Sequence, residues 1–273
     1  MTFTVFTPTY NSGHTLCRVY DSLKRQSFKD FEWIIVNDGS TDDTDMVVAS
    51  FMKEDVVKIY YYKQKNQGKH IAWNNALKHL NGKLFIPADA DDSFSPNTLQ
   101  FFYDKWTGIS NKDLYSGINC LCYNPNNNQV IGDIFPVDEM DSNNLDLFYK
   151  YKIRGEKWGC IRTDLIKETP FPALKNNFYP ESYIWFTLAK KYRVKCFNTP
   201  LRYYFNTDTG LISNLKNKRL SKNQLRVSAH WCRWELVNFP MYLLKNSPKD
   251  FFYLVLKYIK SSINYMVYDL YNR

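Results

Sequence analysis

The chain has 273 residues, of which 17% are aromatic, and it contains no low-complexity tract. This composition excludes an intrinsically disordered protein and predicts a fold with a substantial core. The net charge of +9 is concentrated at one end, because residues 213–273 contain 11 Lys and Arg against 3 Asp and Glu.

The first hundred residues alternate strand-like and helix-like segments. The strands are expected at 3–7, 31–36, 56–62 and 83–88, and the helices at 14–25, from Ser40, at 69–80 and at 95–106. Two helix starts carry cap signals: Ser40 and Asp43 have capping-box spacing, and Ser95 precedes a proline at the first helical position. The alternation predicts an α/β fold with a doubly wound, mostly parallel sheet.

In such sheets, ligands bind beyond the carboxyl ends of the strands. Three polar clusters follow strands of this chain, at 9–11, at Asp38 and at 89–92. The sequence therefore predicts a ligand site at this edge of the sheet.

Beyond residue 110 the alternation loosens. A hairpin-like pair of strands is expected at 114–123 and 129–135, a helix at 182–192 and a short strand at 194–197. From Ser221 onward the chain is expected to be helical, with a second cap-and-proline signature at Ser247. We therefore predict a domain at 1–212 followed by a basic, amphipathic helical extension at 213–273.

The six cysteines form no CxxC pair, which favours reduced thiols over a disulfide framework. No signal peptide precedes the first strand, and the longest strongly apolar run, 251–256, is too short to span a bilayer. We therefore expect a cytoplasmic location.

The acidic cluster Asp89-Ala90-Asp91-Asp92 follows an apolar strand. Crowded carboxylates repel one another unless a cation or a proton neutralises them. Mg²⁺ and Mn²⁺ prefer such oxygen ligands and complete their coordination with substrate phosphates. A solvated turn that caps the next helix is the alternative, and an EF-hand is excluded because the loop glycine and the final glutamate are missing.

Two further motifs have both a binding and a structural interpretation. Asp38, at the end of the second strand, can accept hydrogen bonds from a base or ribose, but Asp-Gly-Ser is also ordinary turn chemistry. The segment 66–69 opens a helix with a lysine, which favours an anion, but it can equally be a solvated helix start.

Taken together and in order, these motifs resemble glycosyltransferase family 2 of the GT-A fold. Four segments carry the resemblance: Pro8-Thr9-Tyr10-Asn11; Asp38-Gly39-Ser40-Thr41-Asp42; Asn66, Gly68, Ala72, Asn74 and Ala76; and Asp89, Asp91 and Asp92 with Pro96 downstream. The resemblance implies a GT-A domain with a nucleotide-binding half at 1–110 and an acceptor half at 111–212.

The resemblance also implies roles for single residues. The residues implied to bind the nucleotide are Pro8, Thr9, Tyr10, Asn11, Asp38, Lys69, Asn74, Asp89 and Ala90. Asp91 is expected to hold a divalent cation, Mn²⁺ or Mg²⁺, of the DXD type, and Asp92 is expected to face the sugar or the acceptor. UDP is the nucleotide that the family habit favours.

The family is inverting, so one carboxylate should deprotonate the acceptor hydroxyl. The family usually has a Glu-Asp pair followed by tryptophan, and this chain has Glu181-Ser182 before Trp185. Because serine cannot act as the base at neutral pH, Glu181 is the candidate. A glutamate that only stabilises the helix start is the alternative.

The acceptor surface is expected in the variable middle of the chain. Trp158 and Trp185 could stack on sugar faces there, although Trp185 has helical spacing to Leu188 and could belong to the core. The basic extension at 213–273 favours peripheral contact with a membrane over nucleic acid, for which no binding motif is present.

The expected function is transfer of a sugar from a nucleotide donor to a saccharide or a lipid-linked acceptor in polysaccharide or glycan synthesis. A non-catalytic binder of sugar nucleotides is the alternative because of Ser182. A sugar-nucleotide nucleotidyltransferase would need a glycine-rich triphosphate loop in place of Pro8-Thr9-Tyr10-Asn11, and an oxidoreductase would need a GxGxxG turn.

Overall fold

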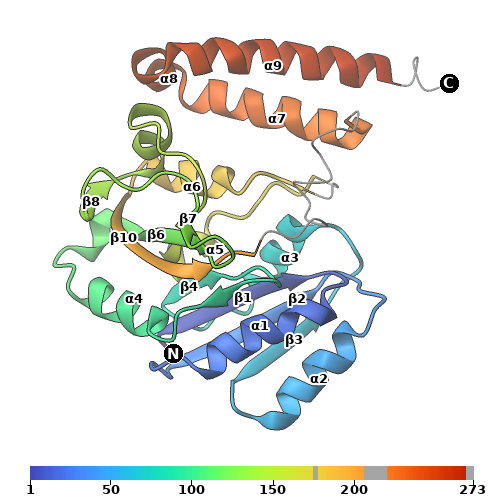
Figure 1. Cartoon of the computed structure of the whole chain (residues 1–273). Coiled ribbons are helices and arrows are strands. Elements are labelled where there is room, and N and C mark those ends of the chain that lie inside the picture. The colour runs from blue at the N-terminus through green and yellow to red at the C-terminus, as the bar shows by residue number, and fades with distance from the viewer. Residues whose placement is uncertain (175–177, 206–219, 269–273) are drawn as a thin grey trace.

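The computed structural model describes residues 1–174, 178–205 and 220–268, which form one ten-stranded sheet with helices on both faces (Figure 1). The strands are β1 (Phe3–Thr9), β2 (Phe31–Asn37), β3 (Ile59–Lys63), β4 (Leu84–Pro87), β5 (Ser93–Phe94), β6 (Tyr115–Asn124), β7 (Gln129–Val130), β8 (Glu139–Ser142), β9 (Lys157–Arg162) and β10 (Arg193–Tyr203). The helices are α1 (Gly13–Lys24), α2 (Thr44–Glu54), α3 (Lys69–Ala76), α4 (Thr98–Thr107), α5 (Thr163–Lys167), α6 (Ser182–Ala189), α7 (Lys222–Asn238), α8 (Pro240–Asn246) and α9 (Pro248–Val267), with a 3₁₀ turn η1 (Lys112–Leu114) and a π-helical turn η2 (Asp146–Lys150).

The main path through the sheet runs β3-β2-β1-β4-β9-β6-β10-β5. The pairs β1–β2, β1–β4, β2–β3 and β6–β10 are parallel. β9 is antiparallel to both of its neighbours, β4 and β6. The predicted α/β fold with a mostly parallel sheet is therefore confirmed, and β9 is the strand that joins its two parallel parts.

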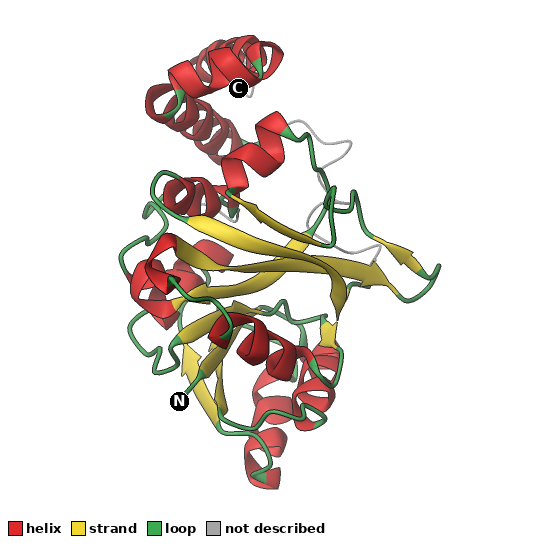
Figure 2. Ribbon diagram, turned by 90° about the vertical axis from the view of Figure 1, so that its left-hand side faces the viewer, coloured by secondary structure: helices red, strands yellow, loops and turns green. Residues whose placement is uncertain are grey.

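The period-two alternation of the strands divides the core between the two faces of the sheet. In β1, Phe3 and Val5 pack with residues of α1, α2 and α4. Phe6 points to the other face and packs with residues of α3, α5, α6 and α7. Figure 2 shows these layers from the side, with the C-terminal helices at the top of the view, beyond the sheet.

Two predicted helix starts are wrong. α2 begins at Thr44 because Asp42 accepts the Thr44 N–H at 3.1 Å, while Ser40 is used elsewhere and accepts the Asn11 N–H at 2.9 Å. α4 begins at Thr98, because Ser95 N–H donates to the Leu201 carbonyl at 3.0 Å beside the β5–β10 pair.

β10 is much longer than the predicted strand at 194–197, since it continues to Tyr203 alongside β6. The added residues pair with β5. This extension carries an arginine, Arg202, from the second half of the chain to the acidic turn after β4.

The predicted C-terminal helices are present, and α7 begins with a capping box between Ser221 and Gln224. Trp231, Leu243 and Leu254 of α7–α9 share a hydrophobic cluster with Phe6 of β1. The boundary predicted between residues 212 and 213 lies outside the described residues. None of the described helices is long and apolar enough to cross a membrane.

Candidate active site

A cleft of about 1490 Å³ opens at the carboxyl ends of β1, β2 and β4. We name the two sides of the cleft after the nucleotide-binding and acceptor halves that the sequence predicts. The donor wall consists of the loops after these strands and the start of α3, and the acceptor wall consists of η2, β9, α6 and the end of β10. The predicted residues that line the cleft are Pro8, Thr9, Tyr10, Asn11, Asp38, Lys69, Asp89, Ala90, Asp91, Trp158, Glu181 and Trp185.

The loops after β1 and β2 are hydrogen-bonded to each other. Besides its N–H bond to Ser40, Asn11 accepts the Thr41 N–H at its Oδ1 atom, 2.8 Å away. Asn11 has a positive φ of 49°, which asparagine tolerates better than most residues. These bonds leave Tyr10 half-exposed at the rim and Thr9 buried, with a hydroxyl that has no hydrogen-bond partner among the described residues.

Asp38 holds the start of α3 against the end of β2. Its carboxylate accepts the N–H groups of Gln67 at 2.9 Å and Gly68 at 2.7 Å, and the side-chain amide of Gln64 at 2.8 Å. Gly68 has a φ of +98°, a conformation that favours glycine. A carboxylate accepts about four hydrogen bonds, so Asp38 retains capacity for a ligand.

Lys69 and Arg202 neutralise the first carboxylate of the acidic turn. Lys69 contacts Asp89 Oδ1, and Arg202 lies 3.2 Å from Asp89 Oδ2. Burial by itself would raise the pKa of Asp89, but these two cations outweigh that effect and lower it. Asp89 is therefore a fixed anion that receives one cation from each half of the chain.

Asp92 does not face the cleft, in contrast to the expectation that it contacts the sugar or acceptor. Its side chain is 1% exposed, lies 2.8 Å from Arg202 Nε and accepts the Asp89 N–H at 2.8 Å. Burial raises the pKa of Asp92, and the Arg202 guanidinium opposes the increase. Asp92 therefore stabilises the acidic turn through its contacts with Asp89 and Arg202.

Asp91 lines the cleft and makes no ion pair with any described residue. Burial and the charge of Asp89 raise its pKa. No group of three or more His, Cys, Asp or Glu side chains in the described part of the chain is arranged to hold a metal ion. The geometry fits an ion that takes one carboxylate and completes its shell with ligand oxygens, as Mg²⁺ does with substrate phosphates.

The charges of the cleft also fit a cation. Among the described residues that line the cleft, carboxylates outnumber the side chains of Lys and Arg. The carboxylates are Asp38, Asp89, Asp91, Glu156 and Glu181, and the cations are Lys69, Lys157 and Arg202. An anionic diphosphate would add to this excess. A divalent cation beside Asp91 would offset it.

Glu181 is the carboxylate of the acceptor wall that approaches the acidic turn through Lys69. It precedes α6, and its Oε1 atom lies 2.6 Å from Lys69 Nζ. Lys69 contacts Asp89 with the same nitrogen, so the two carboxylate oxygens are within about 6 Å of each other. Although burial would lower the pKa of Lys69, the two carboxylates raise it and keep the lysine charged.

Trp158 lines the cleft but cannot serve as the expected sugar platform, because it is 5% exposed. Its ring stacks on Phe94 with centroids 4.8 Å apart, and its Nε1 donates to the Pro87 carbonyl. Trp185 is half-buried and packs edge-on against Trp73, with centroids 6.2 Å apart. Trp158 is thus a core residue, and Trp185 belongs partly to the core.

Asn74 is not among the lining residues of the cleft, in contrast to its expected role in nucleotide binding. Its amide donates to the Phe171 carbonyl and accepts the Phe171 N–H, both at 2.8 Å. Asn74 therefore ties the segment before α6 to α3 and lies behind the donor wall.

Arg202 is the main residue of the site that the sequence did not reveal. It is 6% exposed and lies 113 positions beyond Asp89. The sequence signal for it was an arginine between the hydrophobic residues Leu201 and Tyr203. An arginine buried in a strand requires a carboxylate partner, which indicates an ion pair at this position. Glu156 also lines the cleft, and burial raises its pKa.

The match to a known protein family covers the part of the chain that contains the donor wall. Residues 4–129 match the model of glycosyl transferase family 2. An uncharacterized glycosyltransferase of Rickettsia conorii is 28% identical over 162 residues, which are 57% of this chain and 25% of that protein. The glycosyltransferase GlyA of Streptococcus pneumoniae is 33% identical over 102 residues, 37% of this chain and 14% of that protein. The chain spans a third or less of the length of four such curated relatives.

Solved structures share the fold over most of the chain. TarS 1–349 of S. aureus in complex with UDP-GlcNAc has a TM-score of 0.64 at 23% identity, covering 86% of this chain and 67% of that one. The mannosyltransferase PcManGT of Pyrobaculum calidifontis, in complex with GDP-Man and Mn²⁺, has a TM-score of 0.55 at 15% identity, covering 97% and 86%. These similarities confirm a GT-A-type fold.

Proposed function

Residues 4–129 belong to glycosyltransferase family 2, and from this premise we propose that the chain transfers a sugar, with inversion, from a nucleotide-diphosphate donor to a hydroxyl of a saccharide or a lipid-linked acceptor. Such a reaction belongs to the synthesis of polysaccharides or glycans of the cell surface. One observation carries the proposal: Lys69 joins Asp89 of the donor wall to Glu181 of the acceptor wall inside one cleft.

The donor is a UDP-sugar in this proposal. The unpartnered Thr9 hydroxyl and the remaining acceptor capacity of Asp38 would meet the polar edge of the uracil, with Tyr10 against its face. Asp89, fixed by Lys69 and Arg202, would accept hydrogen bonds from the ribose. The TarS structure with UDP-GlcNAc supports a donor of this kind.

Asp91 would hold the divalent cation, Mn²⁺ or Mg²⁺, together with the donor diphosphate. Its carboxylate is the one in the acidic turn that no described cation neutralises. When bound, such an ion neutralises charge on the leaving nucleoside diphosphate. The PcManGT structure with Mn²⁺ supports this assignment.

Glu181 acts as the general base. Its carboxylate accepts the proton of the acceptor hydroxyl while the oxygen of that hydroxyl bonds to the anomeric carbon. The bond from that carbon to the diphosphate breaks, and the nucleoside diphosphate leaves with the electron pair. Lys69 orients Glu181 toward the acidic turn, so the base is in position before the acceptor binds.

A thermal-shift experiment tests the donor assignment. UDP-glucose, UDP-GlcNAc, UDP-galactose and GDP-mannose are each added with Mn²⁺, with Mg²⁺ or with EDTA. At a concentration about 100-fold above its Kd, the correct donor stabilises the protein by about 3 kcal/mol, an increase in Tm of roughly 5–10 °C. Stabilisation should require both the sugar nucleotide and the cation.

The Asp91→Asn variant is the internal control for the metal. It should fold normally and lose the cation-dependent part of the shift, whereas exposed Asp43→Asn should retain it. The proposal fails if none of the sugar nucleotides stabilises the protein at millimolar concentration with Mn²⁺. Stabilisation without any turnover would instead identify a non-catalytic binder.

A further inference from the structure

The outer face of α9 carries a continuous row of exposed apolar side chains, which we call the α9 stripe. Its members and their exposed fractions are Phe252 (60%), Leu256 (67%), Ile259 (47%), Ile263 (53%) and Met266 (76%). The spacing of four, three, four and three residues places all five on one side of a helix. Scattered surface apolar residues are common, but a row along one helix requires an explanation.

The opposite face of α9 is already covered. Leu254 is buried in the same cluster as Trp231 of α7, and the hydroxyls of Ser261 and Ser228 are 2.9 Å apart. At its start, Asp250 lies 3.1 Å from Lys152, which fixes α9 to the acceptor half. The α9 stripe is therefore exposed although the opposite face of the helix is packed against the rest of the protein.

Three exposed lysines, Lys249, Lys257 and Lys260, border the stripe on one side. With 100° per residue, they lie about 60–140° around the helix from Phe252, between the stripe and the buried face. None of them is within ion-pair distance of a described carboxylate. The stripe thus has a cationic edge that forms no ion pair within the part of the chain that the structure describes.

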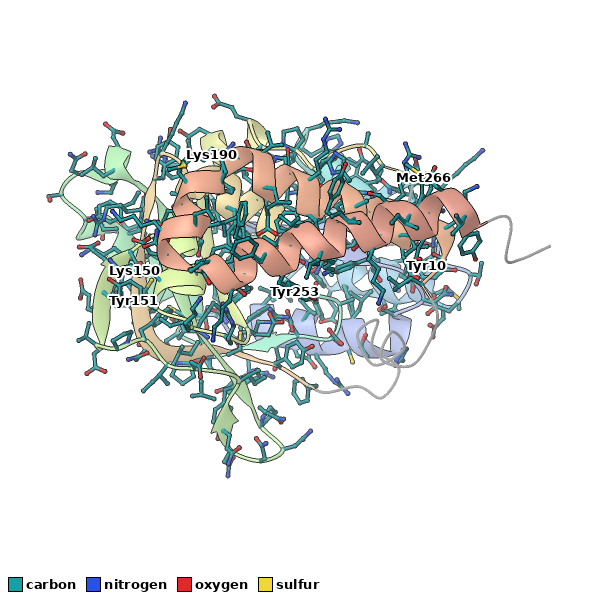
Figure 3. All side chains as sticks on the ribbon, turned by 90° about the horizontal axis from the view of Figure 1, so that it is seen from above. Tyr10, Lys150, Tyr151, Lys190, Tyr253 and Met266 are labelled. Atoms are coloured by element: carbon teal, nitrogen blue, oxygen red, sulfur yellow. The ribbon has the colours of Figure 1, made fainter. Side chains whose placement is uncertain are left out.

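The shape and size of the stripe argue against a second copy of the chain. Figure 1 shows α9 as the outermost layer, and Figure 3, viewed from that side, shows it lying across the molecule, with Tyr253 and Met266 along its length. At about 150–250 Å² for each large side chain when fully exposed, the five members expose roughly 450–750 Å² together. A stable protein interface needs about 800 Å² on each partner. Like-charged lysines along the edge would also repel each other in a symmetric pair.

We propose that the α9 stripe docks on the surface of an anionic bilayer, with the helix axis in the plane of the membrane. The apolar side chains enter the boundary between headgroups and acyl chains, and the lysines remain at the phosphate level. A single protruding helix fits a soft, flat surface because it needs no complementary groove. This inference does not depend on the proposed function, since vesicle binding is measured without any donor or acceptor.

Co-sedimentation of the full chain with vesicles tests the proposal. Vesicles of phosphatidylcholine alone are compared with vesicles that contain 30% phosphatidylglycerol. The protein should partition at least tenfold more strongly onto the anionic vesicles, and the difference should shrink at high salt because exposed charges are screened.

Two sets of variants separate the apolar and the charged contributions. Leu256→Ser with Ile263→Ser should reduce partitioning onto anionic vesicles at least tenfold. The matched control, Met46→Ser with Val56→Ser, changes two exposed apolar residues of the other end of the molecule and should leave partitioning unchanged. Replacing Lys249, Lys257 and Lys260 with Gln should remove the anionic preference, whereas Lys53, Lys78 and Lys83 changed to Gln should retain it.

Circular dichroism and thermal melting of each variant show whether it is folded, which is expected because all of the substituted side chains are exposed. Sedimentation velocity without vesicles measures the oligomeric state and so tests the alternative that the stripe binds a second copy of the chain. The proposal is overturned if the stripe variant pellets like the unmodified protein. It is also overturned if the protein is a dimer that this variant makes monomeric while vesicle binding is absent.

Discussion

The two walls of the cleft are built by different kinds of contact. In the donor wall, the functional side chains follow parallel strands directly, and neighbouring loops bind each other, as Asn11 does with Ser40 and Asp38 with Gly68. In the acceptor wall, the decisive contacts join distant parts of the chain. Arg202 reaches Asp89 across 113 positions, and Glu181 meets Lys69 only in the folded molecule.

This difference explains why the positions of some site residues can be predicted from the local sequence and those of others cannot. A loop after a parallel strand lies at the binding edge by topology alone, so its chemistry follows from its position in the sequence. The acceptor wall is brought to the donor wall by the pairing of β9 with β4 and of β10 with β6 in the same sheet. Substitutions in the two walls should therefore have different effects on activity and on stability.

Glu181→Gln should have the largest effect. Removing the base of the proposed reaction should lower kcat by roughly 10²–10⁴-fold, while donor affinity remains within about threefold. Initial rates with the donor found by thermal shift, together with donor titration, measure both. Exposed Glu168→Gln is the matched control. Near-normal turnover with intact donor binding would remove Glu181 from the mechanism.

Arg202→Gln should be the most destabilising change in the site. It leaves Asp89 and Asp92 without their shared buried cation, which costs about 3–5 kcal/mol. Urea unfolding followed by tryptophan fluorescence measures the loss, with exposed Arg25→Gln as the control. A loss below 1 kcal/mol would mean that the acidic turn does not depend on the acceptor half.

The contact of Glu235 in α7 with Tyr149 of the acceptor half should make stability depend on pH. Burial raises the pKa of Glu235 from 4.5 to about 7, and its carboxyl accepts a hydrogen bond from Tyr149 of η2. The folded protein binds the proton more tightly than the unfolded chain, so this stabilisation is full below pH 4.5 and is lost as the pH rises through 7.

Glu235→Gln removes this titration. Relative to the unmodified protein, the variant should gain up to about 3 kcal/mol of stability between pH 4.5 and pH 8, from 1.36 kcal/mol for each pKa unit. Urea unfolding across this range measures the gain, and Glu168→Gln should show none. A pH-independent difference would contradict the assignment.

Asn74→Ala should have the smallest effect. It removes two hydrogen bonds to Phe171 and should cost about 1–3 kcal/mol of stability without changing donor affinity. Parallel measurement of urea unfolding and donor titration separates the two. A tenfold weaker donor affinity at unchanged stability would restore Asn74 to the nucleotide site.

The sequence by itself determined the fold class and most of the donor wall. Apolar strands followed by polar loops define where Thr9, Asp38, Asp89 and Asp91 lie, because the order of strands and helices permits few topologies. Motif spacing was sufficient for these residues, and each of them lines the cleft.

Only the tertiary structure decided which of the remaining residues face the cleft. Asp92 was expected there, but it is buried in the acidic turn. Trp158 lines the cleft, but its ring stacks on Phe94 and is too buried to form a sugar platform. The cations of the acidic turn, Lys69 and Arg202, come from both halves of the chain. The position of Arg202 is set by the register of β10 with β5 and β6, which local spacing does not encode.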